Sequence, residues 1–187
     1  MMFREDKATA MAVFFLKQAP DQRLDDLVLM KLMVIAERKN MAMHTSLITG
    51  ARFASMQNGP VLSEVLDLFR EQKPTGLWGR CIGYVPHKGR GTPSNHLVLK
   101  NDLDLSQHLS EHELKLLESV WHEFGHKRKW TLVGITHEFP EWDRTCQATK
   151  SSRPINLEDV FHLGLGDPAD RARERAQEIE YFEEVAA

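Results

Sequence analysis

Five consecutive residues in the middle of the chain have the types and spacing of a zinc-protease motif. His122-Glu123-Phe124-Gly125-His126 spells H-E-x-x-H, in which two histidines one helical turn apart bind zinc and the glutamate acts as base for the bound water. Gly125 stands where the helix is expected to end, which takes His126 out of phase with His122. No third ligand follows at a suitable spacing, because Lys127-Arg128-Lys129 comes next. A zinc metallohydrolase is therefore the weakest interpretation, and we expect no catalytic residues, no metal and no cofactor.

A basic cluster with an aromatic neighbour, His126-Lys127-Arg128-Lys129-Trp130, overlaps this motif. Basic residues beside an aromatic ring can bind phosphates or nucleic acid. The same pattern is typical of a solvated helix end, where cations interact favourably with the helix dipole. A net charge of -3 argues against a chain whose overall field recruits nucleic acid. A nucleic-acid-binding regulator stays as an alternative.

One lysine lies inside the most apolar stretch of the chain. The segment from Asp26 to Ala36 is apolar almost all round except for Lys31, and a helix that is hydrophobic on every side is buried on every side. Flanking charges such as Glu37 and Arg38 make it too short to span a bilayer. A buried ammonium without a partner is costly. Either the Lys31 head reaches an acidic neighbour or water, or Lys31 marks a functional surface.

The remaining pattern predicts mostly helices around this segment. Hydrophobic content of 42% and charged content of 27% are those of an ordinary globular protein. Ser110-Glu111-His112-Glu113 is a capping box that begins a helix ending at Gly125. Two β-rich runs, 80–85 and 95–100, predict an antiparallel hairpin. Helices are expected over 6–18, 23–39, 61–72, 111–124, 130–137, 157–163 and 167–185, with an irregular connection over 40–48 and a helical turn within 49–56.

These elements define the expected fold class, which is mainly α. We expect a compact helical domain around a central buried helix, with a small two-stranded β-hairpin and a charged C-terminal helix. Two cysteines, Cys81 and Cys146, have neither metal spacing nor a disulfide framework, which suits a reducing cytosol. The apolar run at 11–16 lacks a small-residue cleavage site, so no signal peptide is expected. We therefore expect a cytoplasmic protein with no membrane partner.

The segment Asn58-Gly59-Pro60-Val61 is the strongest turn signal in the chain. Asn-Gly and Gly-Pro both mark turns, and Pro60 fits the first turn of a helix, where its missing N–H costs nothing. A sharp reversal here would bring Asn58 close to Lys31. Turns held by a rigid scaffold often carry binding residues. Lys31, Asn58, Gly59 and Pro60 are thus the predicted partner-binding residues, unless the turn only begins a helix.

A second set of residues is expected to have a structural role: Val61, His137 and Trp142. An indole and an imidazole separated by four residues can pin the end of a helix to the core. The indole would supply apolar area, and the imidazole would supply a hydrogen bond.

Three stretches in this order resemble the Panacea domain, also called the SocA-like antitoxin domain, of bacterial and prophage toxin–antitoxin loci. The first is Leu29-Met30-Lys31-Leu32-Met33-Val34-Ile35-Ala36. The second is Asn58-Gly59-Pro60-Val61, followed by Val65 and Phe69. The third runs from Leu114 through Glu123-Phe124-Gly125 and Thr136-His137 to Pro140-Glu141-Trp142. Phe124 replaces the family's usual tyrosine, and Asn58 stands where an aromatic is common.

The resemblance covers roughly residues 8 to 160 and implies a binding protein, not an enzyme. It implies an antitoxin that neutralises a co-encoded toxin by direct protein binding, or a proteolytic adaptor that delivers the toxin to a protease component. It also implies that the H-E-x-x-H match lies on a family helix that is not a metal site. We expect the family domain over 1–165 and a charged helix or arm over 166–187, and leave homo-oligomerisation open.

Overall fold

The computed structural model describes residues 2–71, 75–87 and 94–164. The arm at 166–187 and its predicted helix lie outside the described residues. The fold is mainly α, as predicted. The helices are α1 (Glu5–Gln18), η1 (Pro20–Gln22), α2 (Asp26–His44), α3 (Ser63–Arg70), α4 (Gly76–Cys81), η2 (Leu105–Gln107), α5 (Glu111–Phe124), α6 (Lys129–His137), α7 (Thr145–Thr149) and α8 (Leu157–Gly164). The strands are β1 (Arg23–Asp25), β2 (Phe53–Met56), β3 (Gly59–Leu62), β4 (Ile82–His87), β5 (Ser94–Leu99) and β6 (Arg153–Pro154).

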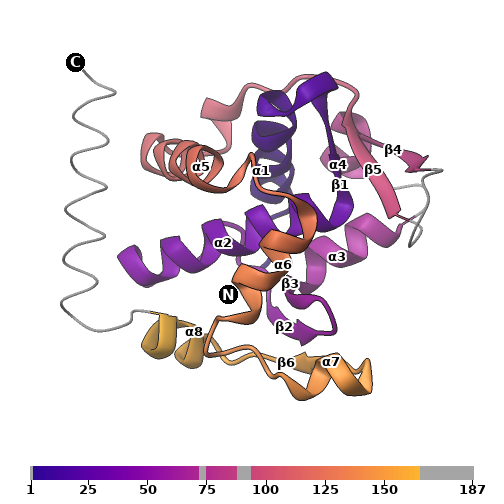
Figure 1. Cartoon of the computed structure of the whole chain (residues 1–187). Coiled ribbons are helices and arrows are strands. Elements are labelled where there is room, and N and C mark those ends of the chain that lie inside the picture. The colour runs from indigo at the N-terminus through magenta and orange to yellow at the C-terminus, as the bar shows by residue number, and fades with distance from the viewer. Residues whose placement is uncertain (1, 72–74, 88–93, 165–187) are drawn as a thin grey trace.

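The helix α2 is the centre of the molecule. It crosses the view in Figure 1 with α1 and α5 on one side and α8 on the other, and it contacts all three as well as α6 and β3. The Asp25 side chain caps its N-terminus by accepting a hydrogen bond from Leu27 N at 3.0 Å. None of the described helices combines the length and the apolar character that a membrane span requires. The predicted buried central helix is confirmed.

The ends of α2 differ from the prediction. Residues 23–25 form β1, and the helix continues to His44 through the segment predicted as irregular. Asn40 and Met41 are buried, and the Asn40 amide donates to Ser46 O at 2.8 Å. Tertiary burial therefore extends the helix past the point where its apolar pattern stops. The other predicted helices agree more closely, and the Ser110–Glu113 capping box is confirmed.

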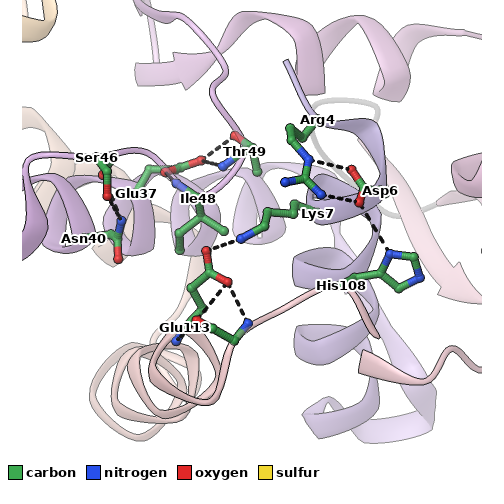
Figure 2. A network of polar contacts seen from close by, with 11 residues as sticks. Arg4, Asp6, Lys7, Glu37, Asn40, Ser46, Ile48, Thr49, His108 and Glu113 are labelled. Atoms are coloured by element: carbon green, nitrogen blue, oxygen red, sulfur yellow. Dashed lines mark hydrogen bonds and ion pairs between the residues drawn. The ribbon is translucent and has the colours of Figure 1, made fainter. Parts of the chain in front are cut away.

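A second buried charge, Glu37, lies on α2. Its carboxylate is fully buried and accepts hydrogen bonds from Ile48 N and Thr49 N, both at 2.7 Å, and from the Thr49 hydroxyl (Figure 2). Burial raises the pKa of Glu37, against the effect of these donors. Glu37 was considered from the sequence only as a charge that flanks the apolar stretch, and the structure buries it. These hydrogen bonds hold residues 48 and 49, which follow α2 in the chain, against the helix.

Polar contacts also join the helices around α2. The Lys7 ammonium on α1 forms an ion pair with Glu113 on α5 (Figure 2). The second carboxylate oxygen of Glu113 accepts from Ser110 N at 2.8 Å, as the capping box requires. A single carboxylate thus both begins α5 and fixes it against α1.

The strands form two small antiparallel sheets, with the strand orders β1-β5-β4 and β3-β2-β6. The predicted hairpin corresponds to β4 and β5, although residues 80 and 81 belong to α4 and β1 adds a third strand. The second sheet was not predicted. The expected helical turn at 49–56 contains β2, and Gly59–Leu62 is the strand β3, so the helix after Pro60 begins only at Ser63. Antiparallel pairing gives residues 53–56 and 59–62 backbone partners across the turn, and a helix that began at Pro60 would remove this pairing.

Candidate functional site

Residues 57–60 comprise the two-residue turn between β2 and β3 and the first two residues of β3, and we call them the hairpin tip; they are held between α2 and the end of α6. Gln57 and Asn58 are exposed there, whereas Gly59 and Pro60 are buried. Gly59 has φ +92, in the region that favours glycine. A Cβ at Gly59 would lie 2.7 Å from Thr136 Oγ1 and 3.0 Å from Lys31 Nζ. Both the backbone conformation and the packing therefore require glycine at this position.

Lys31 reaches the hairpin tip from α2. Its side chain is 0% exposed, and Nζ donates a 2.7 Å hydrogen bond to the carbonyl oxygen of Pro60. The acceptor is a backbone carbonyl, not the acidic neighbour or water expected from the sequence. Burial lowers the pKa of Lys31 to about 7. The predicted proximity of Lys31 to the turn is correct, and the amine fastens the turn to α2.

The other side of the hairpin tip is held by the end of α6 and the residues after it. The rings of His137 and Trp142 stack with centroids 3.8 Å apart and an interplanar angle of 5°. Trp142 Nε1 donates to Met56 O at 3.0 Å, and Asp143 N donates to Ser55 Oγ at 2.9 Å. Trp142 therefore contacts the hairpin directly, as a structural role requires.

One of the two ring nitrogens of His137 has no hydrogen-bond partner within the described residues, although the His137 side chain also has a hydrogen bond with the backbone of Gln57. This nitrogen, Nε2, is buried. Burial lowers the pKa of His137, and the nearby Lys31 charge lowers it further. Val61 is buried in β3 opposite Ala54. The structural roles of Val61, His137 and Trp142 stay predictions, which substitutions can test.

An ion pair between Arg38 and Glu141, which was not predicted from the sequence, supports this arrangement. Arg38 Nε on α2 donates to Glu141 Oε1 at 2.7 Å, and the Glu141 side chain is almost fully buried. The Arg38 guanidinium also lies 4.2 Å from the centroid of the Phe139 ring. The available signals were Arg38, two residues after the last apolar residue of the run in α2, and Glu141, directly before Trp142. Their separation of 103 residues hid the pairing.

The H-E-x-x-H residues do not form a metal site. The helix α5 ends at Phe124, so His126 lies beyond it and stacks edge-on against Trp121, with centroids 5.9 Å apart. The Glu123 carboxylate accepts from Lys39 Nζ at 2.9 Å. In the described ranges, no group of three or more His, Cys, Asp or Glu side chains could hold a metal ion.

Comparison with known protein families agrees with this geometry. Residues 29–143, more than half of the chain, match the family model for the antitoxin SocA-like, Panacea domain. The chain belongs to this antitoxin family. No curated protein and no solved structure matches it. The matched range of this SocA-like domain begins within α2 and ends just after Trp142, so it contains the whole hairpin tip and every side chain that holds it.

Proposed function

We propose that this SocA-like protein is a cytoplasmic antitoxin that neutralises a co-encoded toxin by direct protein binding. The observation that carries the proposal is the family match over residues 29–143. Family membership favours a binding role over catalysis, and the H-E-x-x-H residues lack the geometry of a metal site. The family domain is assigned to 1–165, consistent with a hydrophobic core that extends from Ala8 to Val160.

The hairpin tip is the proposed partner-binding site. Asn58 is exposed and can contact the toxin, whereas Lys31, Gly59 and Pro60 are buried and act by holding the tip in place. The tip is fixed by Lys31 on one side and by Trp142 on the other. A binding loop fixed before association loses little conformational entropy on binding, which favours affinity.

Co-expression with the toxin gene of the adjacent reading frame tests the proposal. The wild-type chain should restore growth to cells that express the toxin. Asn58→Ala should fold normally by circular dichroism and lose this rescue, because it removes an exposed side chain without disturbing Gly59 or Pro60. Asn95→Ala is the matched control, since Asn95 is also exposed but lies on the other sheet, in β5. Full rescue by Asn58→Ala would remove the hairpin tip from the proposed interface.

The same cells distinguish direct neutralisation from delivery to a protease. Direct binding leaves the amount of toxin unchanged while growth is restored. An adaptor shortens the toxin half-life, and the effect disappears in cells that lack the relevant protease component. Failure of the wild-type chain to restore growth or to bind the toxin would refute the antitoxin proposal.

A further inference from the structure

The helix α6 has one side in the core and one side in solvent. Leu132, Val133 and Thr136 are buried, whereas Trp130 and Gly134 are exposed. The Trp130 side chain is 59% exposed. Tryptophan is usually well buried on average, and exposed tryptophan is enriched among the residues that dominate protein–protein interfaces. This side of α6 is therefore unlike an ordinary solvated helix surface.

Gly134 lies one turn after Trp130 on the same side of α6. Its φ is not among the positive values found at Gly50, Gly59 and Gly76, so the helix backbone does not require glycine there. A Cβ at this position would meet no atom within 4 Å. Glycine inside a helix is less stable than alanine, and nothing in the described structure compensates for that cost. Close approach of another molecule would explain why glycine occupies this position.

The residues next to Trp130 carry positive charge. Lys129 is paired with Asp25 at 2.7 Å. In the described part of the chain, neither Lys127 nor Arg128 has an anionic partner, and both are exposed. Two such cations complement an acidic protein surface. They are few for nucleic acid, because proteins that bind it firmly neutralise roughly six to ten phosphates.

We propose that Lys127, Arg128, Trp130 and Gly134, the α6 face, dock an acidic segment of the toxin protein. The indole of Trp130 anchors the segment, and the missing Cβ of Gly134 lets the toxin backbone pack against the helix. The two cations pair with carboxylates of the segment. This inference rests on the proposed antitoxin function. It gives the toxin a second contact region beside the hairpin tip, because α6 also contacts β3 (Figure 1).

Calorimetric titration of the full chain with a non-toxic variant of the adjacent gene's toxin tests the α6 face. Trp130→Ala and Arg128→Glu should each weaken toxin binding at least about tenfold, and the wild-type affinity should fall as salt increases. Gly134→Ala should raise the melting temperature by about 1–4 °C while also weakening binding at least about tenfold. Glu118→Ala, an exposed change on α5, is the control and should alter neither quantity.

The possible outcomes separate this inference from the antitoxin proposal. Toxin binding by the wild-type chain with equal affinity in all α6 variants would overturn the α6 face and leave the antitoxin proposal intact. No toxin binding by the wild-type chain would overturn the antitoxin proposal itself. A lower melting temperature for Gly134→Ala would show that the glycine has an internal role and would overturn the inference without reference to any toxin. If the α6 variants lost binding to a short mixed-sequence DNA duplex while their toxin binding stayed unchanged, the α6 face would be assigned to nucleic acid. That result would also overturn the inference.

Discussion

Replacing Lys31 by methionine tests how the hairpin tip is held. The substitution removes the buried amine and its hydrogen bond to Pro60 O while keeping an unbranched apolar side chain. It leaves Gly59 and Pro60 unchanged. The expected consequence is a change in how the free energy of unfolding depends on pH.

The size and sign of this change follow from the pKa of Lys31, which burial lowers from 10.5 to about 7. Between these pH values the unfolded chain holds a proton that the folded protein has released, so the wild-type free energy of unfolding rises with pH. The rise is about 1.4 kcal/mol for each tenfold change in proton concentration. Across the whole window it approaches about 5 kcal/mol. Below the folded pKa, Lys31 is charged in both states, and the full cost of burying the ammonium remains.

Urea unfolding of the wild-type chain and of Lys31→Met, at several pH values above 7, measures this effect. The wild-type stability should increase relative to that of Lys31→Met as pH rises. Burial raises the pKa of Cys81 and of Tyr84, but both groups are present in the two proteins and their contributions cancel in the difference. Measurements begin above neutral pH because the pKa of His137 is lowered by burial and then by Lys31, so its titration differs between the variants.

Lys127→Met is the matched control, since Lys127 is exposed and should show no such pH dependence. If the free energies of unfolding of the wild-type chain and of Lys31→Met differed by the same amount at every alkaline pH, the reasoning would be contradicted. That result would mean that Lys31 keeps its proton in the folded protein over this pH range, and that burial does not make it a neutral amine beside the hairpin tip.

Two further predictions concern the structural residues and the metal motif. Trp142→Ala should lower the free energy of unfolding by about 3–5 kcal/mol, because the buried indole stacks on His137 and donates to Met56 O; an unchanged thermal melt would remove its structural role. Metal analysis of the purified protein should find no stoichiometric zinc, since His126 lies beyond the end of α5. About one zinc per chain, lost in His122→Ala and His126→Ala, would refute that prediction.

The helices α5 and α6 could be predicted from the sequence because their signals are local. The capping box places the Ser110 and Glu113 side chains three residues apart, and Gly125 directly follows the last helical residue. The apolar run around Lys31 likewise determined that α2 is buried. A helix that is apolar on every side leaves apolar surface in water unless other elements cover all of its sides. The neighbourhood of Lys31 and the Gly59-Pro60 turn was also predictable, whereas the hydrogen bond from Lys31 Nζ to Pro60 O was not.

The partners of the buried charges were decided only by the tertiary structure. Glu37 binds the backbone of residues 48 and 49, and Arg38 binds Glu141. Neither set of partners can be predicted from the neighbouring sequence, because the same charged residues at the end of an apolar helix can equally face water. The β2–β3 hairpin is a similar case. Short strands owe their stability to partners that pack against them, and here those partners are Lys31 on α2 and Trp142 after α6, which come together only when the chain is folded.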